Sequence, residues 1–271
     1  MRLSTFCVVK NEIYFIGYHI MSILDHVDEM VFYDNSTDGT TETIEYIQKK
    51  YDKSGKIKLF KGKDCKDLKD DYARLFDECL RRCSGDYVWF IHPDMICINP
   101  DNISKIKHME GLRASIKIHS VAGEDRELLI ADGRTDRWAT IFKNNFGLHY
   151  YGHYGSSDED MYFRYITGDE HIFYKKLNIL PYVIQDTDIE LIHYCDTKPY
   201  TRRLGRMEAV LTNVIPGADL DTIKQLSIAH PRVTLQSGEW NGTKFTFKEN
   251  DLEVPSIFKK YKKEFEPLRR V

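Results

Sequence analysis

The chain has 271 residues, of which 42% are hydrophobic and 30% are charged, as in a globular α/β protein of one large domain or two small ones. Its net charge of -3 excludes a protein whose whole surface binds polyanions. No run approaches 18 apolar residues and no secretion signal opens the chain, so we expect a cytoplasmic protein with no transmembrane segment. The six cysteines form no C-x-x-C pair, which favours reduced core thiols over a zinc site.

The first 91 residues alternate short apolar runs with amphipathic segments. Strands are expected at 5–9, 29–33, 58–60 and 87–91, and helices at 13–24, at about 40–51 and at 72–83. Thr37 or Asp38 is the expected N-cap of the second helix, and Cys79 and Cys83 fall on the buried face of the third. This order predicts a mostly parallel sheet with right-handed crossovers.

The pattern changes after residue 100. Strands of a smaller mixed sheet are expected at 113–121, 137–143 and 172–175, and helices at 157–167, 201–213, 219–229 and 257–270. The last helix has an apolar face surrounded by lysines and arginines. We therefore expect a first domain over residues 1–196 and a helical C-terminal extension, residues 197–271, packed on it.

Two predicted strands end in residues suited to ligand binding. The strand at 87–91 runs into His92 and Asp94, and in open α/β sheets ligands bind beyond the carboxyl ends of the strands. The strand at 29–33 ends at Asp34, whose carboxylate is suited to a base or a ribose, while the amides of the following helix face a phosphate. The chain has neither a dinucleotide glycine fingerprint nor a Walker lysine, so neither NAD nor a P-loop triphosphate fits.

Three segments resemble glycosyltransferase family 2, whose members are inverting enzymes with the GT-A fold. They are Val8–Glu12 followed by Asp34–Thr40, the strand from Gly85 to Asp94, and Gly155–Arg164. Their order and separations make the resemblance much more specific than any one segment, and it covers roughly residues 4–165. It implies an α/β fold of the GT-A type, a Rossmann-like mostly parallel sheet flanked by helices, with the smaller mixed sheet and helical extension described above.

The resemblance implies a nucleoside diphosphate sugar as donor. Asp34 would accept hydrogen bonds from the nucleobase, Arg74 would face the sugar nucleotide, and four further residues would contribute to the same pocket: Val9, Asn11, Glu12 and Asp38. The segment Ala73-Arg74-Leu75 departs from the family, because Leu75 stands where the family has asparagine.

The resemblance also implies a divalent metal, Mn²⁺ or Mg²⁺, and a carboxylate base. Asp94 would bind the metal across the diphosphate, with His193 as a late metal ligand. His92 replaces the first acid of the family's Asp-x-Asp motif, and hard cations prefer carboxylates to imidazole. Asp160 would deprotonate the acceptor hydroxyl, with Glu159 and Asp158 as alternatives. This reading requires residues 34, 94 and 160 to converge on one cleft.

Other interpretations stay open at this point. The acidic cluster before residue 161 also suits helix capping, and His193 also suits a buried core histidine. The chain is alternatively a catalytically silent nucleotide- or sugar-binding module, or a nucleotidyltransferase on a related fold. The acceptor is a glycan, a lipid-linked sugar or, ranked last, a modified nucleic acid. The basic C-terminal helix is either a solvated face or a peripheral membrane contact.

Overall fold

The computed structural model describes residues 1–62, 75–76, 78–122, 127–131, 136–144, 148–150, 172–174, 184–194, 239–240, 243–249 and 252–270. The chain divides into two compact units. Unit 1 comprises Met1–Ile116, Trp138–Leu191 and Val254–Val271, and unit 2 comprises Lys117–Arg137 and Ile192–Glu253. No helix among these described residues is both long enough and apolar enough to cross a bilayer.

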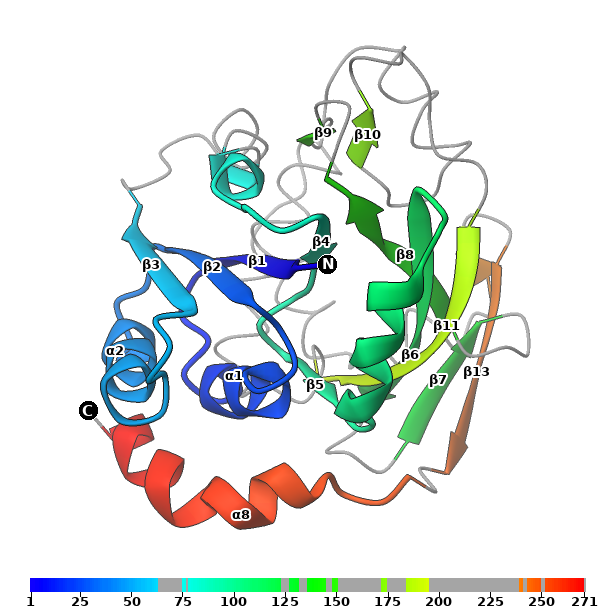
Figure 1. Cartoon of the computed structure of the whole chain (residues 1–271). Coiled ribbons are helices and arrows are strands. Elements are labelled where there is room, and N and C mark those ends of the chain that lie inside the picture. The colour runs from blue at the N-terminus through cyan, green and yellow to red at the C-terminus, as the bar shows by residue number, and fades with distance from the viewer. Residues whose placement is uncertain are drawn as a thin grey trace, which may run out of the picture. The chain divides into compact units, whose positions relative to one another are not determined.

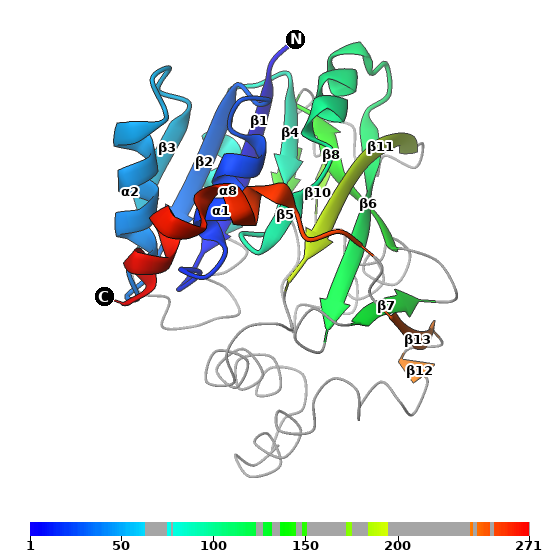
Figure 2. The ribbon, with the colours of Figure 1, turned by 90° about the horizontal axis from the view of Figure 1, so that it is seen from below.

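Unit 1 contains the parallel sheet that the sequence predicts. Its strands lie in the order β3 (Ile57–Lys61), β2 (Glu29–Asp34), β1 (Leu3–Val9) and β4 (Tyr87–Phe90), each parallel to its neighbour (Figures 1 and 2). At one side β8 (Asp136–Lys143) pairs antiparallel with β4. The α/β fold class is therefore confirmed.

Helices cover both faces of this sheet. α1 (Ile16–Ile23) and α2 (Thr40–Lys50) lie on one face, and the helical segment that includes residues 78–81 lies on the other (Figure 1). On that second face Phe76 packs edge-on against Phe6 and Phe90, with ring centroids 6.5 and 5.0 Å apart. Every residue of β2 is buried, as expected for a strand covered on both sides. Cys79 and Cys83 are buried thiols, as predicted.

The remaining described parts of unit 1 are short elements. They are β5 (Met95–Cys97), the 3-10 helix η1 (Pro100–His108) and the antiparallel pair β9 (Leu148–Tyr150) and β10 (Ile172–Tyr174). Three strands each contribute residues to both units: β6 (Arg113–Ala122), β8 and β11 (Ile184–His193).

The C-terminal helix packs on the first two helices of the chain. α8 (Ser256–Phe265) continues into the 3-10 helix η2 (Glu266–Arg270) and lies beside α1 and α2 (Figure 1). Tyr18 of α1 contacts Phe258 and Phe265, with ring centroids 4.5 and 5.2 Å apart. The Glu264 carboxylate accepts a hydrogen bond from Tyr51 at 2.5 Å and pairs with Lys50. The apolar face predicted for the C-terminal helix is therefore buried against other helices of unit 1.

Gly17 permits the close approach of α8. A Cβ atom at this position would lie 2.9 Å from the buried Phe265 ring. We expect Gly17→Val to destabilise the protein by about 1–3 kcal/mol, because the added methyl groups have no room. Urea unfolding measures this, with Phe265→Ala as the second background. The penalty should shrink there, and an equal penalty in both backgrounds would contradict the packing described.

Unit 2 differs from the sequence prediction. β7 (Glu127–Ala131) pairs antiparallel with the end of β6 and with β13 (Thr243–Glu249), which forms a hairpin with β12 (Glu239–Trp240). The predicted extension over 197–271 is therefore not wholly helical, because β12 and β13 lie within it. The helices expected at 157–167, 201–213 and 219–229 lie outside the described residues.

Candidate functional site

The candidate site is the carboxyl edge of the parallel sheet in unit 1. β1 runs parallel to β2 and β4, with Val9 opposite Asp34 and Phe6 opposite Phe90. The three strands therefore end at the same edge, and Asp94 follows β4 after a short turn. This is the edge at which open α/β sheets bind ligands.

Hydrogen bonds join the loops after β1 and β2 into one structure. Val9 accepts a bond from the Asn35 amide at 3.0 Å. Asn11 adopts a left-handed conformation, with φ of 58°, which asparagine tolerates better than most residues. Its amide donates to Ser36 Oγ at 2.6 Å and its Oδ1 accepts from the Thr37 amide at 2.6 Å. Asn11 therefore shapes the site through its protein contacts.

Asp34 is held in a fixed orientation at the end of β2. It is 3% exposed, its Oδ1 accepts from the Ser36 amide at 3.0 Å, and its Oδ2 accepts from the Thr41 hydroxyl. An ionised carboxylate has about four acceptor positions, so these two bonds leave capacity for a ligand. The Gly62 amide donates to the Asp34 carbonyl at 2.7 Å, which fixes the backbone as well.

The start of α2 corrects the predicted cap. Its N-cap residue is Gly39, with φ of 86°, so the prediction of Thr37 or Asp38 is wrong. Asp38 nevertheless accepts bonds from the amide and the hydroxyl of Thr40, at 3.2 and 2.5 Å. The Glu12 amide donates to the same hydroxyl at 2.8 Å. Asp38 and Glu12 thus join the loops after β1 and β2 through their bonds to Thr40. Their contacts to a nucleotide stay predictions.

The segment after β4 carries the carboxylate proposed for a metal. The His92 ring lies edge-on to the Phe90 ring, with centroids 4.8 Å apart. The backbone carbonyl of His92 accepts a hydrogen bond from the Met95 amide at 3.2 Å. Asp94 is 5% exposed. Mg²⁺ is usually held by one or two carboxylates together with substrate phosphates, so Asp94 suits a cation that arrives on a diphosphate. Within the described ranges, no three His, Cys, Asp or Glu side chains gather to hold a metal by themselves.

The remaining predicted site residues lie outside the described part of unit 1. His193 ends β11 within unit 2 and is 7% exposed, whereas Asp94 belongs to unit 1. Its role as a metal ligand therefore stays a prediction. Four further residues lie outside the described ranges: Arg74, Asp158, Glu159 and Asp160. The convergence of residue 160 with residues 34 and 94 is not tested.

Three residues of the site escaped the sequence reasoning. Ser36 and Thr41 bind Asn11 and Asp34, and His19 contacts the segment after β4. Ser36 and Thr41 carry no signal beyond their place in a polar turn. His19 stood three residues after Ile16 on an apolar helix face, where a polar residue calls for a buried partner.

No family model and no curated protein matches the sequence. Solved structures similar to this chain include residues 1–349 of TarS from S. aureus, at 13% identity and a TM-score of 0.46, covering 84% of this chain and 71% of that one. Another is the mannosyltransferase PcManGT from Pyrobaculum calidifontis in complex with GDP-Man and Mn²⁺, at 11% identity, a TM-score of 0.48 and coverages of 88% and 74%.

A third similar structure is glucosyl-3-phosphoglycerate synthase from Mycobacterium tuberculosis in complex with Mn²⁺ and UDP-Glc. It is 21% identical, has a TM-score of 0.33 and covers 44% of this chain and 43% of that one. At such identities and TM-scores, similarity alone assigns neither a substrate nor a catalytic residue to this chain. Membership of family 2 stays a prediction.

Proposed function

We propose that the chain is an inverting glycosyltransferase of the GT-A type, which transfers a sugar from a nucleoside diphosphate sugar to an acceptor hydroxyl. The observation that carries the proposal is the joined pair of loops after β1 and β2. They hold the buried Asp34 carboxylate at the same sheet edge as Asp94. The sequence resemblance supplies the reaction type, and the geometry supplies a site that suits a nucleotide and its diphosphate.

The donor would lie along this edge. Asp34 would accept hydrogen bonds from the nucleobase, and Asp94 would hold a divalent cation. That cation, when bound, would offset the negative charge that develops on the leaving diphosphate. Arg74 and His92 are proposed as further contacts to the sugar nucleotide, and His193 as a further metal ligand.

The reaction needs a base on the face of the sugar opposite the diphosphate. We assign this role to Asp160, which would take the proton of the acceptor hydroxyl. The acceptor oxygen forms a bond to the anomeric carbon while the bond from that carbon to the phosphate oxygen breaks. The nucleoside diphosphate leaves with the bonding electrons, and the configuration at the anomeric carbon is inverted.

A catalytically silent nucleotide- or sugar-binding module is the second candidate. His92 favours it, because an imidazole replaces one of the two carboxylates expected after β4. Hydrolysis or transfer assays with a panel of nucleotide sugars, with and without Mn²⁺, separate the two candidates. Binding without turnover of any donor would favour the module.

The role of Asp34 is tested by nucleotide affinity. We expect Asp34→Ala to weaken the binding of UDP or GDP about 10- to 100-fold, since a hydrogen bond to a charged group contributes about 1.5–3 kcal/mol. Isothermal titration calorimetry measures this. Thr41→Val is the matched control, because it removes a partner of Asp34 but keeps the carboxylate. Unchanged affinity in a folded Asp34→Ala variant would remove Asp34 from the nucleotide pocket.

Membrane contact through α8 is proposed for its lysine face alone, because the apolar face packs on α1 and α2. Four lysines of α8 are exposed: Lys259, Lys260, Lys262 and Lys263. Near an anionic bilayer each contributes about 1 kcal/mol. We therefore expect co-sedimentation with phosphatidylserine vesicles that is lost at high salt and when the four are changed to Gln. Equal binding to neutral vesicles would contradict this.

A further inference from the structure

His19 connects α1 to the segment that carries Asp94. It is fully buried, and its Nδ1 lies 2.8 Å from the Met95 carbonyl oxygen. Because a carbonyl only accepts hydrogen bonds, Nδ1 carries the proton and donates it to this bond. The neutral ring is the stable form, since burial lowers the pKa of His19 to about 4 against the opposing effects of the Met95 bond and the Asp94 charge. The Met95 carbonyl therefore accepts its hydrogen bond from Nδ1 of a buried, neutral ring.

Met95, the residue after Asp94, is held through both its amide and its carbonyl. Met95 donates its amide to the His92 carbonyl at 3.2 Å and offers its own carbonyl to His19. Asp94 directly precedes Met95 in the chain, so its backbone adjoins the residue that His19 holds. A shift of α1 or a loss of the imidazole would therefore release the backbone next to Asp94.

Ser22, one turn further along α1, makes a second contact to β5. Its hydroxyl donates to the His19 carbonyl at 2.7 Å and accepts from the Cys97 amide at 3.2 Å. Both residues fix β5 on α1, but only His19 acts beside Asp94. A comparison of His19 and Ser22 variants therefore separates the packing of β5 on α1 from the positioning of the segment beside Asp94.

The imidazole is costly to bury for packing alone. Its Nε2 is buried and finds no hydrogen-bond partner among the described residues, and an unsatisfied buried polar atom is destabilising. The neighbouring positions that face the same way, Ile16, Ile20 and Ile23, are fully buried aliphatic residues. A leucine at position 19 would fill the space without this penalty, but it would leave the Met95 carbonyl without its donor.

We propose that His19 is a positioning residue: it fixes the Asp94–Met95 segment so that the Asp94 carboxylate is pre-oriented for a divalent cation carried by a diphosphate. The inference rests on the proposed function and adds a residue that holds the metal ligand. Residues that orient a metal ligand typically change metal affinity or activity about 10- to 100-fold when they are replaced.

The test measures Mn²⁺ affinity by electron paramagnetic resonance in the presence of UDP or GDP, together with kcat and KM. We expect His19→Leu to weaken Mn²⁺ binding about 10- to 100-fold. His19→Asn should recover most of it, because its amide nitrogen reaches the position of Nδ1, whereas His19→Gln should not. Ser22→Ala should lower the stability but leave Mn²⁺ affinity unchanged.

Each outcome is decisive. Normal Mn²⁺ affinity in His19→Leu, or an equal loss in Ser22→Ala, would overturn the proposal. If His19→Leu does not fold, the Asn and Gln variants decide, and equal Mn²⁺ affinities in those two would overturn it. Asp94→Asn separates this failure from that of the proposed function, because normal Mn²⁺ binding in that variant would show that Asp94 is not a ligand.

Discussion

Replacing Asp160 by Asn is expected to reduce kcat about 10²- to 10⁴-fold and to leave donor affinity unchanged. An amide is nearly the same size as the carboxylate but cannot accept the proton of the attacking hydroxyl. The donor is held by other residues in the proposed site, so its binding should persist. Radiolabelled sugar transfer measures the rate, and calorimetry with the nucleoside diphosphate measures the affinity.

The two preceding acids of the same segment are the controls. Glu159→Gln and Asp158→Asn nearly keep the side-chain size and remove the other two carboxylates one at a time. We expect each to retain transfer within a few-fold of the wild type. If Asp160→Asn transfers sugar at a near-normal rate while one of these two is inactive, the base is assigned to the wrong residue.

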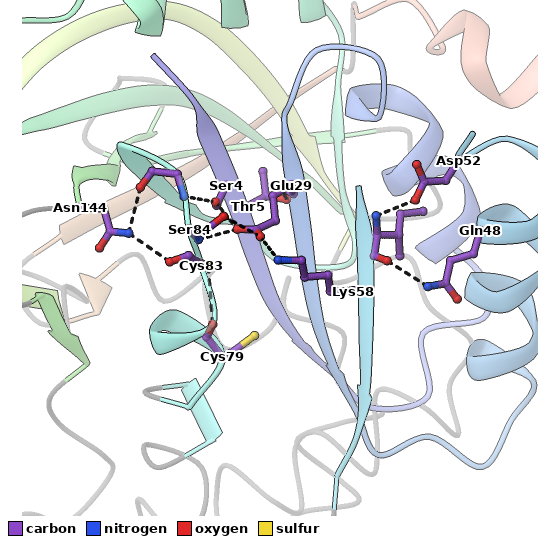
Figure 3. Close-up of polar contacts among 12 residues, drawn as sticks. Ser4, Thr5, Glu29, Gln48, Asp52, Lys58, Cys79, Cys83, Ser84 and Asn144 are labelled. Atoms are coloured by element: carbon purple, nitrogen blue, oxygen red, sulfur yellow. Dashed lines mark hydrogen bonds and ion pairs between the residues drawn. The ribbon is translucent and has the colours of Figure 1, made fainter. Parts of the chain in front are cut away.

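Replacing Glu29 by Ala is expected to produce the largest loss of stability, about 3–5 kcal/mol, because it removes one partner of a buried charge network. Glu29 begins β2 and is 1% exposed. Its carboxylate accepts from Ser4 Oγ at 2.5 Å and from the Ser84 amide at 2.6 Å, and it pairs with Lys58 of β3 (Figure 3). Ser4 also accepts from the Gly85 amide at 2.8 Å. One carboxylate therefore holds β1, β3 and the turn before β4.

Urea unfolding measures the loss, and Lys58→Met is the control. Lys58 is 43% exposed, so its removal should cost less than the removal of Glu29, which leaves buried donors without an acceptor. If the two variants lose equal stability, the ion pair with the exposed Lys58 makes the main contribution of Glu29 to stability. The hydrogen bonds from Ser4 and Ser84 would then contribute little.

The same carboxylate makes stability depend on pH. Burial alone would raise the pKa of Glu29, but hydrogen bonds from Lys58, Ser4 and Ser84 outweigh it and hold the pKa below its usual value of 4.5. The unfolded state therefore binds this proton more readily, so the stabilisation is complete above pH 4.5 and is lost as the pH falls through the lower folded-state pKa. Urea midpoints measured from pH 7 down to pH 3 should converge for the wild type and Glu29→Gln. Parallel curves would contradict this.

The sequence predicted the parallel part of the fold well because each element carried a local signal. The continuous apolar run of β2 follows from burial of the strand on both faces. The helical spacing of Phe76, Cys79 and Cys83 follows from burial of one face of a helix. The strand ends then place Asp34 and Asp94 at one sheet edge without further information. These two carboxylates of the site are thus placed by the predicted strand ends alone.

What the sequence did not predict depends on contacts between distant residues. β13 has an alternating pattern, Thr243 to Glu249, that becomes a strand through its pairing with β7. The N-cap of α2 is an exception, because Asp38 accepts from the Thr40 amide only two residues away and Gly39 takes the cap position. The partners of Glu29 lie 25 to 55 residues away from it in the chain. The pairings of Glu29 leave no local pattern, so periodicity and capping rules cannot find them, whereas the alternation in β13 is a local strand signal that the sequence prediction missed.

A nucleoside diphosphate is expected to lie across the edge formed by the ends of β1, β2 and β4. A crystal structure of the chain with UDP or GDP and Mn²⁺ tests it most directly. We predict that the base contacts Asp34 and that Mn²⁺ bridges the diphosphate and Asp94. A nucleotide bound elsewhere, or bound at this edge with Asp94 turned away from the diphosphate, would contradict the account.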